Sequence, residues 1–257
     1  TVELLTREGE IVIAKRIEEG LRELMKAMAL FPGTVEHILN EYALIDSEER
    51  RLNDLITGYP DTADDDIPPP APQVTAADKA DSDDDEDEAA TGPDPEEAKI
   101  RFTELKKQYQ KTSNSVNRNG RDHPRAEAEL EKLGELFKSF KLTPRQFEPL
   151  LQHIRAVLTR LRRHEKTVMS LAVRGAKMPR KEFITSFPGN ETNEKWIDKH
   201  IRAKKPYSEL LVNVKTEVIR AQKKIKLLEE ETGLTVTEIK DINRQMSIGE
   251  AKSRRAK

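Results

Sequence analysis

The chain has 257 residues, of which 36% are charged and 35% hydrophobic, and it contains no cysteine. Globular domains usually have about 25% charged and about 45–50% apolar residues, so this composition favours an extended helical protein over a sheet enzyme with a thick core. The lack of cysteine excludes disulfides and thiolate metal sites, and no apolar run reaches the roughly 20 residues of a membrane span. Because the first residues also lack the pattern of a signal peptide, we expect a soluble, cytoplasmic protein.

The net charge of −2 hides a strong segregation of charge along the chain. Residues 1–60 carry −5 and residues 61–97 carry −14, whereas residues 98–257 carry +17. A basic body joined to an acidic segment suggests contact with nucleic acid or with a large charged partner. Charge alone leaves open the alternative of solvated helix faces joined by a disordered spacer.

The first 58 residues have the apolar periodicity of two helices. Thr6 is suited to cap the first helix, and Phe31–Gly33 ends it because proline cannot continue the hydrogen-bond ladder. Thr34 is suited to cap the second helix, whose stripe continues to Ile56, with Gly58 just past its end. The first stripe consists of Ile11, Ala14, Ile17, Leu21, Leu24 and Met28, and the second of Val35, Ile38, Leu39, Tyr42, Ile45, Leu52, Leu55 and Ile56.

Residues 59–93 lose this periodicity and are rich in proline, alanine and acids. Ile67 and Val74 are the main apolar side chains that this segment could bury. Ordering the backbone costs roughly 1–2 kcal/mol per residue, which so few apolar groups cannot offset. We therefore predict a long, acidic, disordered linker.

Helical periodicity returns at residue 94 and continues to residue 246. Asp94 with Pro95 and Thr143 with Pro144 are two helix starts, and the second of these helices is long enough to reach Val173. Shorter helices and one further long helix follow. Because we find no convincing strand and no internal repeat, the predicted fold is all-α, with about eight to ten helices.

Two capping boxes stand near the end of the chain. Thr235 with Glu238, and Ser247 with Glu250, each combine a hydroxyl and a carboxylate that can satisfy the first amides of a helix. The first box predicts a short helix. The second predicts a new helix at residue 247, which has almost no apolar face and stops on a basic run.

The sequence offers little for catalysis or for a metal. There is no glycine-rich phosphate loop and no nucleophile with a plausible base, so we expect no enzyme activity, no cofactor and no small-molecule substrate. The histidines lack zinc-like spacing. We expect ordinary surface or boundary positions for all of them: His37, His123, His153, His164 and His200.

Basic clusters are the richest chemical signal. Lys and Arg anchor phosphates without regard to sequence, but aromatic residues are only 5%, and this gives no stacking platform for single-stranded bases. Solvated helix faces are the alternative for each cluster. The clusters are Arg160, Arg162, Arg163 and Lys166; Lys177, Arg180 and Lys181; Lys204 and Lys205; Lys223, Lys224 and Lys226; and the terminal Lys252, Arg254, Arg255 and Lys257.

Both ends of the sequence resemble the primary bacterial sigma factors of the sigma-70 family. The second half of that family's region 1.2 is similar to "TVELLTREGEIVIAKRIEEG" (1–20). The approach to its region 2 is similar to "EEETGLTVTEIKDINRQMSIGEAKSRRAK" (229–257). The variable non-conserved insert, with its acidic segment, resembles "LNDLITGYPD" (52–61) and "MPRKEFITSFPGNET" (178–192).

The resemblance covers essentially the whole chain and implies four parts. They are residues 1–58 with region 1.2 and the first insert helix, the linker 59–93, the helical insert 94–246, and the start of the region 2 core-binding helix at 247–257. The resemblance further implies that this is a fragment, since the family continues into helices that bind the polymerase clamp and read the promoter. The implied function is promoter recognition and transcription initiation.

The partners implied by the resemblance are core RNA polymerase, at the clamp of its β′ subunit, and promoter DNA, with no membrane contact. Positions matched to the family place one set of side chains near DNA: Arg7, Lys15, Arg16, Arg50 and Arg51. A second set is placed near core polymerase: Lys252, Arg254 and Arg255. A stand-alone helical adaptor, whose basic face binds an acidic protein or nucleic acid, is the alternative function.

The acidic segment suggests a hypothesis of its own. It could mimic nucleic acid or shield basic surfaces from DNA. Deleting residues 81–88 should then raise non-specific DNA affinity, and an unchanged affinity would leave this segment the role of a spacer.

Overall fold

The computed structural model describes residues 7–59 and 92–256, and side chains from Gly9 onward. The all-α prediction is confirmed, and the predicted acidic linker falls largely on residues outside the described part. The elements are α1 (Arg7–Ala29), α2 (Thr34–Asp46), η1 (Leu52–Asp54), β1 (Ile56–Gly58), α3 (Pro95–Asn119), α4 (Pro124–Phe137), β2 (Lys141–Leu142), α5 (Pro144–Met169), η3 (Ser170–Gly175), α6 (Arg180–Ser186), α7 (Lys195–Arg202), α8 (Ser208–Thr232) and α9 (Val236–Ala256).

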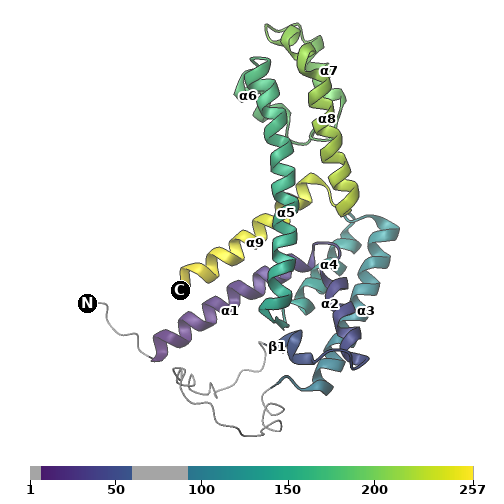
Figure 1. Ribbon diagram of the computed structural model, residues 1–257, viewed down its shortest axis with the longest axis vertical. Coiled ribbons are helices and arrows are strands. Elements are labelled where there is room, and N and C mark those ends of the chain that lie inside the picture. Colours follow the sequence, from purple (N-terminus) through teal and green to yellow (C-terminus); the bar gives the residue numbers. More distant parts are fainter. Residues whose placement is uncertain (1–6, 60–91, 257) are drawn as a thin grey trace, which may run out of the picture.

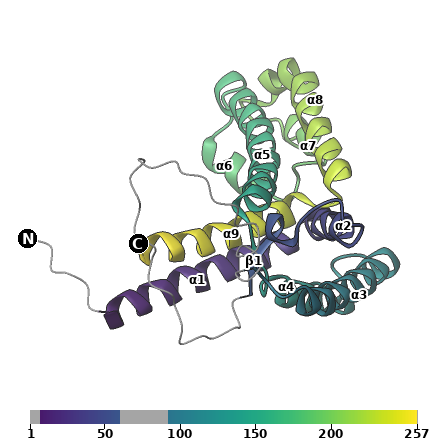
Figure 2. The ribbon, with the colours of Figure 1, turned by 60° about the horizontal axis from the view of Figure 1, so that its bottom comes forward.

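Three parts make up the described molecule (Figure 1). The arm consists of α1 and α9, which lie side by side in both ribbon views (Figure 2). The lobe consists of α2, β1, α3, α4 and β2. The tower consists of α5 and α8, with η3, α6 and α7 toward its far end. One apolar core joins the arm to the base of the tower, a second fills the lobe, and a third fills the far half of the tower.

In the lobe, a short antiparallel ladder replaces the end of the predicted second helix. The helix ends at Asp46, and Glu48 just beyond it has a φ of 62°, which breaks the helical path. Ile56 then pairs in extended form with Leu142. The predicted continuation of the helix to Ile56, and the prediction that the chain has no strand, are therefore wrong. Apolar spacing does not distinguish the two structures here, because Leu55 and Ile56 are fully buried although their segment is not helical.

Thr143 stabilises this ladder and does not cap its own helix. Its backbone N–H donates to the Leu55 carbonyl at 3.0 Å, and its hydroxyl donates to the Asp54 carbonyl at 2.8 Å. Pro144 nevertheless opens α5 as predicted, and the helical path continues through a π-helix from Ser170 to Gly175. The cap predicted at Asp94 is confirmed, since its carboxylate accepts from the Glu96 amide at 2.9 Å.

The tower contains a buried histidine that the sequence did not reveal. His200 is 7% exposed, so the expected surface or boundary position is wrong for this residue. Its ring packs against Trp196 with centroids 5.0 Å apart, and its Nδ1 lies 3.4 Å from the Tyr207 hydroxyl. Glu182 of α6 accepts from that hydroxyl at 2.5 Å and from Lys205. This network ties α6, α7 and the start of α8 together.

The last helix is one continuous element. The capping box at Thr235 and Glu238 is confirmed, since the Thr235 amide donates to Glu238 Oε2 at 2.8 Å and the helix starts at Val236. The box at Ser247 is wrong, because Ser247 lies in the middle of α9. Glu250 instead accepts from Arg155 of α5.

Candidate polymerase and nucleic-acid interface

The arm is held by a contact between two glycines. A Cβ built on Gly20 of α1 would lie 2.6 Å from the Ser253 amide nitrogen and 2.7 Å from the Gly249 carbonyl oxygen. A Cβ on Gly249 of α9 would lie 2.8 Å from both the Gly20 carbonyl oxygen and the Leu24 amide nitrogen. The two backbones therefore touch, and any side chain would push them apart.

This glycine seam explains why the basic end of the chain is helical without a wide apolar stripe. Small residues let α9 bury backbone against α1, and Met246 and Ala256 flank the contact as buried side chains. Neither glycine stands out in the apolar pattern of the sequence. The signal that could have found them is a glycine inside a helical pattern, which usually has a packing reason.

Of the predicted polymerase contacts, Lys252 is already engaged within the arm. Its ammonium pairs with Glu23 of α1, and this hydrogen bond raises the pKa of Lys252 above its ordinary value. Arg254 and Arg255 are exposed on the last turn of α9 and make no ion pair among the described residues. Among the described residues at this end of the arm, these two arginines are exposed cations without an ion pair.

The predicted DNA contacts lie on two separate elements. Lys15 and Arg16 are exposed on the N-terminal half of α1, and the side chain of Arg7, the first residue of that helix, is not described. Arg50 and Arg51 lie between α2 and η1 in the lobe. In Figure 1, α1 leads away from the lobe toward the N-terminus. The structure thus joins Lys15 and Arg16 with the α9 cations in the arm, and leaves Arg50 and Arg51 apart.

The two lobe arginines differ in freedom. Arg50 pairs with Glu41 of α2, whose carboxylate also accepts from Gln146 Nε2 of α5 at 3.2 Å. Arg51 is exposed just before η1 and has no ion pair within the described ranges. Of the two, Arg51 is the one that could bind a phosphate without giving up an ion pair to a described residue.

Two polar contacts fix the position of α9 relative to the other parts. Arg121, after α3, donates to Glu238 Oε1 of α9 and to the Leu30 carbonyl after α1, both at 2.8 Å. Lys240 of α9 pairs with Glu165 of α5 at 2.6 Å and with Glu191 of the α6–α7 loop at 3.0 Å. The arm therefore has a defined orientation toward both the lobe and the tower.

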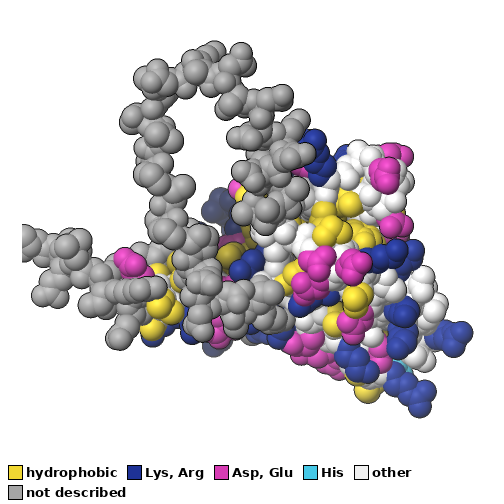
Figure 3. All heavy atoms as spheres, turned by 90° about the horizontal axis from the view of Figure 1, so that it is seen from below, with side chains coloured by type: hydrophobic (Ala, Val, Ile, Leu, Met, Phe, Trp, Pro, Cys, Tyr) yellow, Lys and Arg dark blue, Asp and Glu magenta, His cyan; other side chains and the backbone are white. Residues whose placement is uncertain are grey.

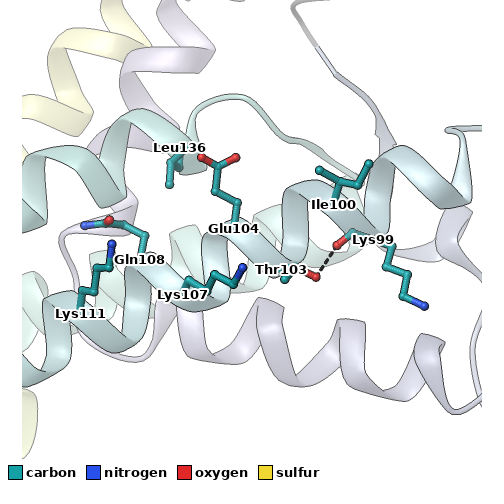
Figure 4. Close-up of a pocket in the computed structure, with 8 residues that line it drawn as sticks. All are labelled: Lys99, Ile100, Thr103, Glu104, Lys107, Gln108, Lys111 and Leu136. Carbon is teal, nitrogen blue, oxygen red and sulfur yellow. Dashed lines mark hydrogen bonds between the residues drawn. The ribbon is translucent and has the colours of Figure 1, made fainter.

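A shallow groove of about 700 Å³ runs along the outer face of α3 (Figure 4). Three lysines, Lys99, Lys107 and Lys111, line it, and Glu104 is the one acid in its lining. The remaining lining residues are Ile100, Thr103 and Gln108 of α3 and Leu136 of α4. These lysines are not among the basic clusters expected from the sequence.

The face of the molecule that is visible in Figure 3 has no continuous basic patch among the described residues. Seen from below, lysines and arginines alternate with acids and apolar patches. Among residues 7–59 and 92–256, no group of three or more histidines and carboxylates could hold a metal ion. No helix in these ranges is long and apolar enough to cross a membrane.

Comparisons with known proteins bear on the whole chain. A sequence model described as the non-essential region of sigma-70 matches residues 31–229. The RNA polymerase sigma factor RpoD of Neisseria gonorrhoeae is 26% identical over 274 aligned residues, which include 100% of this chain and 43% of that protein. The chain thus spans less than half the length of this relative. Since the family match covers most of the chain, the protein belongs to the sigma-70 family.

Proposed function

We propose that this chain is the part of a primary sigma factor that joins region 1.2 to region 2 through the helical insert. Its role is then non-catalytic: it acts in the cytoplasm, in promoter recognition and transcription initiation, by docking on core RNA polymerase and contacting promoter DNA. The collinear match of the full chain to RpoD carries this proposal. The stand-alone adaptor is not favoured by this match.

The arm supports the proposal because it brings together the two segments that resemble region 1.2 and region 2. These segments are far apart in sequence, yet Gly20 and Gly249 put their backbones in contact. In this proposal the chain has four parts, 1–58, 59–93, 94–246 and 247–257, of which the described residues of the first and the last meet in the arm. The last part begins inside α9, so it continues a helix and does not start one.

The exposed cations suggest a division of roles. We assign Arg254 and Arg255 to core polymerase, at the clamp of its β′ subunit, while Lys252 stays with Glu23 as a structural pair. Lys15, Arg16 and Arg51 are assigned to the DNA backbone together with Arg7. Arg50 reaches DNA only if its pair with Glu41 opens.

Binding of the 257-residue chain to core polymerase tests the proposal. Arg254→Glu combined with Arg255→Glu should weaken binding by about tenfold. Each change would place a negative charge opposite the acidic groups that the arginine is proposed to contact, and such like-charge pairs cost free energy. Arg244→Glu, also exposed on α9, reverses one charge on the same helix; it is the control for either single arginine change and should leave the affinity within about twofold. Equal effects of both changes, or no binding of the unaltered chain, would contradict the proposed role of the arm.

A further inference from the structure

The groove on α3 presents three lysines that form no ion pair with a described residue. The Glu129 carboxylate of α4 is ion-paired with Lys132 at 2.8 Å and hydrogen-bonded to Gln108, and it interacts with Lys111 only through the longer-range field. Lys99 and Lys111 lie twelve positions apart on one helix, or about 18 Å along its axis. A row of free ammonium groups of this length suits an extended anionic chain.

The groove also carries apolar surface and one opposing charge. Ile100 is 69% exposed beside the lysines, and Leu136 of α4 borders the same hollow. Glu104 stands among the lysines and points toward Leu136 in Figure 4. An unbroken row of phosphates would meet this carboxylate, whereas a peptide can place a neutral residue there. Lysine ammonium groups also bind single carboxylates as point charges, without the fork geometry of arginine. The chemistry therefore favours an acidic peptide over nucleic acid.

The chain itself supplies such a peptide next to the groove. Residues 81–88, outside the described part, have the sequence DSDDDEDE with seven carboxylates. Glu88 lies seven positions before Pro95, the first residue of α3. Seven residues span at most about 25 Å, and Lys107 lies about 18 Å along the helix from Pro95. The acids can thus reach each of the groove lysines.

We propose that the groove formed by Lys99, Lys107 and Lys111 is a docking site for the acidic segment 81–88 of the same chain. The contact is between carboxylates and ammonium groups, so it is released by salt, as the Debye length falls from about 8 Å at 0.15 M to about 3 Å at 1 M. The tether holds the acids at an effective concentration in the millimolar range. A weak site is therefore occupied without any further partner.

A spin label at Ser82 tests this proposal in the full chain. The protein has no cysteine, so Ser82→Cys gives one labelled position. Paramagnetic broadening of amide signals at Lys99–Lys111 should then exceed, by about twofold or more, that in a chain whose acids are neutralised. That reference keeps the same tether and carries Asp→Asn at 81, 83, 84, 85 and 87 and Glu→Gln at 86 and 88.

Two neighbouring lysines give the matched comparison. Lys107→Glu reverses a charge inside the groove and should remove the excess broadening. Lys106→Glu reverses an exposed charge on the same helix outside the groove lining, and it should leave the broadening in place. Because both changes alter net charge equally, a non-specific effect would appear in both variants.

Three results would overturn the proposal. They are equal broadening with charged and neutralised segments, equal effects of Lys106→Glu and Lys107→Glu, and excess broadening at Arg254 and Arg255 in place of α3. The experiment uses the chain alone, without polymerase or DNA. Its outcome is therefore independent of whether the chain acts as proposed in transcription initiation.

Discussion

At the scale of single residues, two features determine local packing, and neither is visible in the apolar pattern of the sequence. One is the pair Gly20 and Gly249, which replaces side-chain packing by backbone contact. The other is His200, which is buried among Trp196, Tyr207 and Glu182. Both depend on which distant residues meet, and a single sequence gives no measure of that.

The glycine seam predicts a strong effect of one methyl group. Gly249→Ala places a Cβ 2.8 Å from backbone atoms of α1, which cannot rotate away as a side chain could. We expect a loss of about 1–3 kcal/mol in the free energy of unfolding, measured with urea. In the control Gly175→Ala, the new Cβ meets Val214 Cγ1 at 3.5 Å, an ordinary contact. Equal costs for the two changes would refute the seam.

The His200 network predicts a pH-dependent stability. Burial lowers the pKa of His200 below its ordinary 6.5 and outweighs the opposite effect of Glu182, while Lys205 and Lys199 lower it further. The unfolded chain therefore takes up this proton first. The stabilising contribution is complete above about pH 7 and is lost as the pH falls through 6.5 toward the folded-state pKa.

His200→Asn should flatten this part of the stability profile between about pH 7 and pH 5. Glu182 titrates at a lower pH than His200. The hydrogen bonds from Lys205 and then Tyr207 lower the pKa of Glu182 below 4.5, so the contribution of this carboxylate to stability is lost only in stronger acid. Urea unfolding at a series of pH values measures the slope. The same change at the exposed His37, outside the network, should leave stability within about 0.5 kcal/mol. An unchanged slope in His200→Asn would show that His200 does not titrate as described.

At the scale of elements, the sequence predicts helices well where caps and apolar period agree. The starts of α3, α5 and α9 are found at Asp94, Pro144 and Thr235 for this reason. The ladder of β1 and β2 is missed because its strands of three and two residues are too short for a period of two. The two proposed binding surfaces differ in the same way. The arm cations are suggested by the resemblance to the sigma-70 family, whereas the groove forms only where Leu136 of α4 lies beside α3.

A substitution at Lys240 tests how much the contact between α9 and the tower contributes to the free energy of unfolding. Lys240→Met leaves the carboxylate of Glu191, 8% exposed, without its cation. We expect a cost of about 1 kcal/mol, at the low end for a buried group because the Lys240 side chain is 40% exposed. Combining it with Glu191→Gln should cost less than the sum of the single changes.

A surface pair gives the control for this cycle. Lys223 and Glu194 lie 3.9 Å apart with side chains 63% and 42% exposed. Lys223→Met should therefore change the free energy of unfolding by less than about 0.5 kcal/mol. Strict additivity between Lys240→Met and Glu191→Gln would mean that their contact contributes nothing.

At the scale of the whole molecule, an acidic segment and a basic body share one chain. The described body is basic from α3 onward, and the acidic segment stands between the first insert helix and that body. Such an arrangement keeps the net charge near zero while leaving strong local fields. Exposed cations on the arm and in the α3 groove can then serve different anions within one protein.

The contact that closes the arm also sets an order of folding. Glu23 and Lys252 pair across 229 residues, so forming the seam closes a loop of nearly the whole chain. Closing a loop of this length costs more conformational entropy than closing a short one. The contacts of α3 with α4 and of α5 with α8 close shorter loops, so we expect them to form earlier. We expect amides of α5 to gain protection in pulsed hydrogen exchange before those of α9. The two ends of the chain, which carry the surfaces assigned to polymerase and DNA, are then completed only after the insert between them has folded.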